Sequence, residues 1–280
     1  MLTCKIGFMQ GRLSPIINGM IQAFPWENWQ KEFSDSSSIG FHLMEWTLDQ
    51  ANLYHNPLLT IDGQETIHQL KTANQISIPS LTGDCFMQSP FWKTSRKASI
   101  DLQEDFRNIV LACKEIGIST IVIPLVDNGG IENNKQEDSL VNFLNGEIEF
   151  LESNNISIAF ESDYGPHEFR ILIERFESCL FGVNYDIGNS AALGFEPKEE
   201  FQAYAAYILN VHIKDRKLHG TTVPLGDGDA KFPDVFYHLD QSNYSGNLIL
   251  QTARSSNHDH KTPLVTYREK VLEWMMAYQN

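Results

Sequence analysis

The sequence predicts an α/β protein that folds as one (β/α)8 barrel, the TIM-barrel fold, in a single domain covering residues 1–280. Eight short β-rich runs recur along the chain, and longer segments with helical periodicity separate them. The length of 280 residues suits one such barrel. Alternating strands and helices imply a parallel sheet, and eight units imply that the sheet closes. An open doubly wound sheet is the alternative, but no GxGxxG motif follows the first strand.

The expected strands are short and largely apolar. The run Ile121-Val122-Ile123-Pro124-Leu125-Val126 is typical of a parallel strand that is covered on both faces. In chain order, the strands are expected at Lys5–Gln10, His42–Leu48, Ile78–Asp84, Thr120–Val126, Ile156–Ser162, Gly182–Ile187, Asn210–Asp215 and Leu248–Ala253.

The spacing of apolar residues gives bounds for four of the intervening helices. Gly117 follows the first of them as a stop signal, and Pro263 suits the first turn of the last. These helices are expected at Lys97–Ile116, Gln136–Glu152, Glu199–Leu209 and Pro263–Tyr278.

Charge and composition exclude several kinds of partner. The net charge of −15, without a long basic run, opposes binding to a phosphate polyanion, so we expect no nucleic-acid partner. No stretch approaches the roughly 18 apolar residues of a membrane helix, and the first residues lack the pattern of a signal peptide. Cys4, Cys85, Cys113 and Cys179 show no CxxC spacing and are expected to be reduced. The expected location is the cytoplasm.

The last four expected strands each end with a potential metal ligand. These residues are Glu161, Asp186, His212 and Gln251. Taken alone, Glu161 could pair with a buried basic residue, and His212 could be a core histidine. Four such residues at equivalent places on consecutive strands predict one shared cation, because the carboxyl ends of barrel strands meet at one mouth and unpaired polar groups there are costly.

The expected ligand set also limits the identity of the metal. Three oxygen donors and one nitrogen donor favour Mn²⁺ or Mg²⁺, and they leave Co²⁺ or Zn²⁺ open. A structural zinc site would use thiolates, which this set lacks. One divalent metal ion is therefore the expected cofactor.

Five segments carry a resemblance to a known family. They resemble the sugar phosphate isomerase/epimerase proteins of the xylose-isomerase-like TIM barrel superfamily, in the same strand order and over essentially the whole chain. The resemblance is specific for fold and metal site and less so for substrate, because the superfamily also includes inosose dehydratases and abasic-site endonucleases. The segments are Met9-Gln10-Gly11-Arg12-Leu13-Ser14-Pro15, Asn184-Tyr185-Asp186-Ile187-Gly188-Asn189-Ser190, Val211-His212-Ile213-Lys214-Asp215-Arg216, Thr222-Val223-Pro224-Leu225-Gly226-Asp227-Gly228-Asp229 and Gln251-Thr252-Ala253-Arg254.

Two positions depart from the pattern of the ketose 3-epimerases in this superfamily. Those enzymes hold their metal with Glu, Asp, His and Glu, and the fourth position here is Gln251. They carry a substrate-binding His where this chain has Asn189. An amide oxygen can ligate a metal but cannot take up a proton at neutral pH. A two-base epimerisation would therefore need a replacement base, for which Asp215, His167 and Glu45 are candidates.

The resemblance implies a divalent-metal-dependent sugar isomerase/epimerase. Glu161 is the expected base, which removes a proton next to a carbonyl to give a metal-stabilised enediolate. The nearest alternative is a metal-dependent dehydratase of a keto-polyol such as an inosose, and a catalytically inactive sugar-binding barrel is another. A phosphodiester hydrolase is disfavoured by the charge and by Asn189.

The expected partner is a small sugar or keto-polyol, and exposed helical faces would permit a homodimer. For several of the candidates, a surface salt bridge or a structural role is the competing interpretation. The candidate substrate-binding residues are Gln10, Arg12, Glu45, Asp84, His167, Asn189, Lys214, Arg216 and Arg254.

Overall fold

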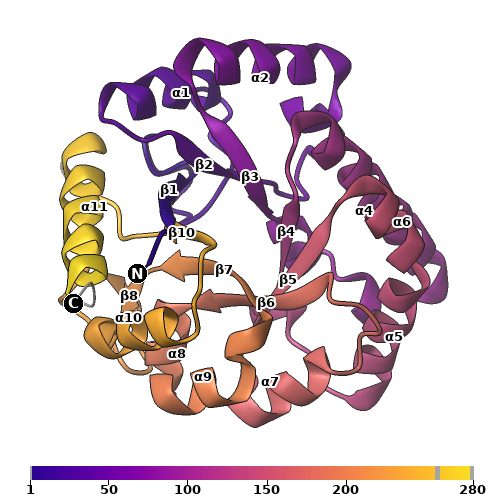
Figure 1. Ribbon diagram of the computed structural model, residues 1–280. Helices are drawn as coiled ribbons and strands as arrows, with labels where there is room; N and C mark the ends of the chain where they lie inside the picture. The colour runs from indigo at the N-terminus through magenta and orange to yellow at the C-terminus, as the bar shows by residue number, and fades with distance from the viewer. Residues whose placement is uncertain (1, 256–258, 278–280) are drawn as a thin grey trace.

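The computed structural model describes residues 2–255 and 259–277, which form a closed barrel of eight parallel strands (Figure 1). Around the barrel the strands follow the order β1-β10-β7-β6-β5-β4-β3-β2, and the helices form an outer ring. The predicted (β/α)8 barrel is confirmed, whereas the domain bounds 1–280 stay a prediction. The barrel strands are β1 (Lys5–Met9), β2 (Leu43–Thr47), β3 (Ser77–Thr82), β4 (Thr120–Leu125), β5 (Ser157–Ser162), β6 (Phe181–Asp186), β7 (Ile208–Ile213) and β10 (Asn247–Leu250).

The helices and a short hairpin connect these strands. The hairpin pairs β8 (Asp215–Arg216) with β9 (Thr222–Val223) just beyond β7. The α-helices are α1 (Trp29–Ser38), α2 (Ile61–Asn74), α3 (Asp84–Gln88), α4 (Arg96–Ile116), α5 (Asn134–Gly146), α6 (Ile148–Asn154), α7 (Pro166–Ile173), α8 (Ile187–Leu193), α9 (Pro197–Tyr204), α10 (Phe232–Gln241) and α11 (Lys261–Met276). The 3₁₀ turns are η1 (Leu53–His55), η2 (Pro57–Leu59), η3 (Phe91–Lys93), η4 (Asp127–Gly129) and η5 (Ala205–Tyr207).

The main apolar core lies between the strands and the helix ring. In α4 one face buries Phe106, Ile109, Val110 and Cys113, and Gly117 ends the helix in the left-handed conformation with a φ of 81°. Complete burial of one large apolar side chain contributes about 1.5–3 kcal/mol, so this face holds α4 on the barrel. The structure thus places α4 where the spacing of apolar residues predicts it.

Two expected helices have different bounds in the structure. The segment Gln136–Glu152 is divided between α5 and α6 because Gly146 is a poor helix former and Glu147 leaves the helical conformation. Glu147 is instead anchored to α4 by Arg107, whose Nη2 lies 2.6 Å from Oε1. The expected helix Glu199–Leu209 corresponds to most of α9 and to the 3₁₀ turn η5. It stops before Ile208, because Ile208 already pairs with Val183 of β6.

The remaining expected helix, Pro263–Tyr278, is largely covered by α11, and Tyr278 lies outside the described residues. The expected strand Gly182–Ile187 ends at Asp186, because Ile187 is already the first residue of α8.

Within the described part of the chain, no helix combines the length and apolarity needed to cross a membrane. All four cysteines are free, as expected.

The centre of the barrel is polar. Asn210 of β7 donates from Nδ2 to Oε2 of Glu45 on β2 at 2.9 Å, although these two strands are not neighbours in the sheet. The contact therefore crosses the barrel interior. Strand register brings Asp186 beside His212, and His212 beside Ile249 of β10. Closure of the barrel thus assembles polar side chains from distant parts of the chain in its interior.

Candidate metal site and active-site cavity

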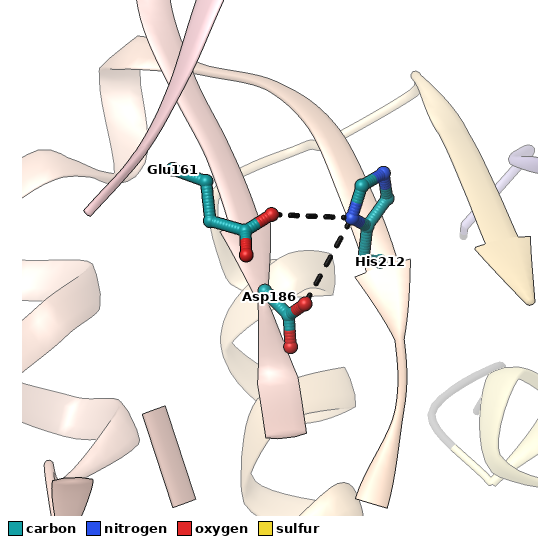
Figure 2. A group of neighbouring side chains, drawn as sticks. All are labelled: Glu161, Asp186 and His212. Atoms are coloured by element: carbon teal, nitrogen blue, oxygen red, sulfur yellow. Dashed lines mark ion pairs between the residues drawn. The ribbon is translucent and has the colours of Figure 1, made fainter. Parts of the chain in front are cut away.

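Glu161, Asp186 and His212 converge from three adjacent strands at the carboxyl ends of β5, β6 and β7 (Figure 2). Nδ1 of His212 lies 3.4 Å from Oε2 of Glu161 and 3.8 Å from Oδ2 of Asp186. One ligand atom from each side chain lies within 4.8 Å of the other two. Donors that share a cation at about 2.1 Å are separated by roughly 3–4 Å, so this spacing suits one metal ion.

Neighbouring amides and one arginine hold Glu161 in place. Asn184 donates from Nδ2 to Oε2 of Glu161 at 2.9 Å, and Asn189 donates to Oε1. Asn189 is itself held by Arg216, whose Nη1 donates to Oδ1 at 2.7 Å. Because both carboxylate oxygens accept hydrogen bonds, Glu161 has a fixed orientation at the edge of the cavity.

His212 is oriented from below by Glu45. Nε2 of His212 lies 2.7 Å from Oε1 of Glu45, and both side chains are fully buried. Burial would lower the pKa of His212, but Glu45, Asp186 and Glu161 together hold this pKa well above its ordinary value. A ligating imidazole is neutral, so a proton on Nδ1 and a metal ion compete for the same position.

Asp186 has a cationic neighbour in Lys214. Nζ of Lys214 lies 2.6 Å from Oδ2 of Asp186, and Oδ1 accepts a hydrogen bond from the backbone of Asn189 at 2.9 Å at the start of α8. Burial would raise the pKa of Asp186, but the charges of Lys214 and His212 lower it to about 2. Asp186 is therefore an anion at neutral pH, as a metal ligand must be.

Gln251 supplies an independent test of whether these residues suit a metal. Its Oε1 is buried and has no hydrogen-bond partner among the described residues, and the side chain lines the same cavity as Glu161. A buried acceptor without a partner costs about 1–3 kcal/mol, so such an oxygen needs a ligand. The donor set of two carboxylates, one imidazole and one amide oxygen fits a divalent cation.

A cavity of about 500 Å³ opens above these groups. This volume is within the range of small-molecule sites. Acidic, basic and amide side chains from β5 and from the segments after β1, β3, β6, β7 and β10 surround it. The wall therefore offers many hydrogen-bonding groups, which suits a polyhydroxylated ligand.

A family model described as xylose isomerase-like TIM barrel matches residues 33–278. The chain belongs to this family. A similar sequence is the L-ribulose-5-phosphate 3-epimerase UlaE of Shigella flexneri, which is 24% identical over 269 residues, or 90% of each chain. The predicted superfamily and the prediction of an enzyme are therefore confirmed.

Solved structures of low identity share the fold of this xylose isomerase-like barrel. The IolI protein with a bound zinc atom superposes with a TM-score of 0.77 at 15% identity, over 98% of this chain and 99% of that one. The D-allulose 3-epimerase from Methylomonas sp., in complex with D-allulose, gives a TM-score of 0.75 at 13% identity over 98% of both chains.

The predicted site residues fall into three groups in this family member: those beneath the cavity, those that line it and those away from it. Asp186 and His212 lie beneath the cavity, and both are almost completely buried. Many of the others face the cavity directly. The predicted residues that line it are Arg12, Asp84, Glu161, Asn189, Lys214, Arg216 and Gln251.

The structure places Gln10, Glu45, His167 and Arg254 away from the cavity lining. Gln10 accepts a hydrogen bond from the backbone of Thr47 at the end of β2, and Arg254 donates to the carbonyl of Ser14 in the segment after β1 at 2.7 Å. His167 is exposed on α7. Glu45 lies below the mouth because β2 continues two residues past it to Thr47.

Sequence reasoning missed Asn184 and Asn210, which connect the ligands to Glu45. Each stands two residues before a ligand on its strand, Asn184 before Asp186 and Asn210 before His212. Residues at this spacing face the same side of a strand. The signal for these two residues in the sequence was therefore an amide side chain that interrupts an apolar strand two positions before a metal ligand.

Proposed function

We propose that this protein is a divalent-metal-dependent sugar isomerase/epimerase in which Glu161 is the base. One observation carries the proposal: Glu161, Asp186 and His212 converge at a polar cavity that is also lined by Gln251, whose oxygen has no hydrogen-bond partner among the described residues. The names of relatives support the substrate class, since UlaE is an L-ribulose-5-phosphate 3-epimerase.

Glu161, Asp186, His212 and Gln251 would hold the metal. Their oxygen-rich donor set favours Mn²⁺ or Mg²⁺ over Co²⁺ or Zn²⁺, which these ligands could also bind. When bound, the metal polarises the substrate carbonyl and makes the neighbouring C–H more acidic.

The side chains of the protein perform the proton transfer and hold the substrate. Glu161 takes the proton from the carbon next to the carbonyl, and Asn184 and Asn189 keep its carboxylate in one orientation. Lys214 and Arg216 line the cavity and provide donors for hydroxyl or anionic groups of the sugar. Return of the proton to the neighbouring carbon would complete an isomerisation, and delivery of a proton to the opposite face of the same carbon would complete an epimerisation.

A second candidate is favoured by Gln251. Because the amide of Gln251 cannot act as a base, Glu161 is the one proposed base among the four ligands, whereas a two-base epimerisation needs a second. A one-base site also suits dehydration, in which loss of a β-hydroxyl follows removal of the proton. Release of water from a keto-inositol would select this reaction.

Solvent exchange tests the base directly. The Mn²⁺-loaded protein is incubated in D₂O with L-ribulose 5-phosphate, D-allulose or a keto-inositol, and NMR follows deuterium at the carbon next to the carbonyl. We expect exchange with the wild type and a loss of about 10²–10⁴-fold in Glu161→Gln. Glu149→Gln, an exposed change on α6, is the matched control and should leave exchange unchanged.

Metal content of each variant is measured alongside, because Glu161 is also a proposed ligand. Undiminished exchange in a metal-loaded Glu161→Gln variant would show that Glu161 is not the base. Tight sugar binding without exchange in the metal-loaded wild type would instead indicate an inactive sugar-binding barrel.

A further inference from the structure

Epimerisation needs a proton donor on the second face of the substrate carbon, and Gln251 cannot be that donor. None of the replacements expected from the sequence is available. The carboxylate of Asp215 accepts hydrogen bonds from the backbone of Gly226 at 2.8 Å and of Gly228 at 2.9 Å and is buried under the β8–β9 hairpin. His167 and Glu45 lie away from the cavity lining.

Asp84 is a buried carboxyl group in the lining of this cavity. It is the first residue of α3, two positions after the end of β3, is 8% exposed, and lines the cavity together with Glu161 and Gln251. Among the described residues, no hydrogen bond or ion pair reaches its carboxylate. Its carboxylate is therefore open to the cavity, where a ligand can contact it.

The backbone around Asp84 is rigid. The N–H of Gly83 bonds to the carbonyl of Val122 on β4 at 2.9 Å, and the N–H of Cys85 bonds to the carbonyl of Leu48 at 2.9 Å. A Cβ atom at Gly83 would lie 2.5 Å from the ring of Phe86, so the close turn into α3 requires glycine. Asp84 is therefore held at a fixed place in the cavity wall.

Other acids at the cavity lack this combination of burial and freedom. Asp127 and Asp163 also line the cavity, but both are exposed. Burial raises the pKa of Asp84 to about 8, with further contributions from the negative charges of Asp49 and Glu161. Asp84 thus retains a proton near neutral pH that it could deliver to a substrate.

We propose that Asp84 is the second acid–base residue of this site and serves the face of the substrate carbon that Glu161 does not reach. This inference rests on the proposed function and narrows it to epimerisation of a ketose or ketose phosphate next to its carbonyl. Asp84 stands after β3 and Glu161 on β5, with β4 between these two strands, so the two carboxyl groups enter the cavity from different parts of its wall.

The proton balance closes with these two groups. Glu161 takes H⁺ from the carbon, and the electron pair of the broken C–H bond passes into the enediolate. The O–H bond of Asp84 then breaks, its proton forms a new C–H bond on the opposite face, and the carbonyl is restored. Asp84 is left as carboxylate and Glu161 as carboxylic acid, and one proton lost to water and one gained from water reset the pair. The reverse reaction uses Asp84 as the base.

The test separates net epimerisation from exchange. Mn²⁺-loaded wild type and Asp84→Asn are incubated in D₂O with L-ribulose 5-phosphate or D-allulose, and NMR follows both the epimeric product and deuterium in the recovered starting sugar. We expect Asp84→Asn to form product at least 100-fold more slowly while Glu161 still exchanges the starting sugar. Glu161→Gln should lose both, and Asp84→Glu should recover at least tenfold over Asp84→Asn.

Two results would overturn the role of Asp84. One is product formation by Asp84→Asn at the wild-type rate; the other is loss of exchange and product together, as in Glu161→Gln, which would indicate a role in binding or folding. Asp101→Asn, an exposed change on α4, is the control and should match the wild type. If the wild type exchanges deuterium but forms no epimeric product, the role of Asp84 is rejected and the proposed function stands. If the wild type shows no exchange, the proposed function is rejected as well.

Discussion

Oε1 of Glu45 lies 2.7 Å from Nε2 of His212, and neither side chain has any exposed surface. Glu45 also accepts hydrogen bonds from Ser80 at 2.7 Å and from Asn210 at 2.9 Å. This network fixes the imidazole ring and directs its Nδ1 toward Glu161 and Asp186. A carboxylate on the far nitrogen of a metal-binding histidine also makes the imidazole a stronger ligand.

Glu45→Gln should therefore weaken metal binding although Glu45 touches no metal. We expect the affinity for Mn²⁺ to fall about 10–100-fold, because the amide loses the charge that supports His212. Isothermal titration calorimetry of the metal-free protein measures it. Ser80→Ala removes one contact of Glu45 and should have a smaller effect; equal affinity of Glu45→Gln and wild type would contradict this account.

Lys214→Met should destabilise the metal-free protein. Asp186 would then be a buried anion without the cation that lies 2.6 Å away, and such a loss costs about 3–5 kcal/mol. Urea unfolding without metal measures the free energy of unfolding, with the exposed Lys217→Met as control. Saturating Mn²⁺ should restore part of the loss, because it supplies positive charge to Asp186.

The same pair has a defined pH dependence. The pKa of Asp186 is lowered from 3.8 to about 2 in the folded protein, so its stabilising contribution is present above pH 4 and disappears as the pH falls toward 2. The difference in unfolding free energy between wild type and Lys214→Met should therefore shrink over this interval. A difference that stays constant from pH 5 to pH 2 would argue against the ion pair.

Gln251→Glu should tighten metal binding. A fourth ligand with a negative charge replaces a neutral amide at the same position, and we expect about tenfold higher affinity for Mn²⁺. Gln251→Leu removes the oxygen and should lower the affinity. Calorimetric titration of both variants measures the effect, and identical affinities in all three proteins would show that residue 251 does not contact the metal.

Asp84→Asn should become more stable than the wild type as the pH rises. The folded protein raises the pKa of Asp84 from 3.8 to about 8, so between these values the folded state holds a proton that the unfolded state has lost. Wild-type stability therefore falls across this window by about 1.4 kcal/mol for each pH unit, and the asparagine variant does not share this fall. Urea unfolding of the metal-free proteins at pH 4, 6 and 8 measures the difference, and a difference that does not grow would contradict the raised pKa.

The sequence by itself determined the order of strands and helices, and it placed Glu161, Asp186, His212 and Gln251 at strand ends. These features are local: apolar runs of strand length define the strands, and a polar residue that ends such a run can be recognised without the fold. The family resemblance also followed from contiguous segments. Helix bounds were less accurate because Ile208 joins the sheet through a pairing with Val183 that helical periodicity cannot reveal.

Only the tertiary structure decided what surrounds those ligands. Glu45 and His212 are 167 positions apart, and they meet because barrel closure makes β2 and β7, which are not neighbours in the sheet, face the same interior. The same closure removes Glu45 from the cavity and leaves Asp84 there without a partner. Such relationships depend on strand register and on the direction in which each side chain points, and these are set by packing of the whole barrel rather than by neighbouring residues.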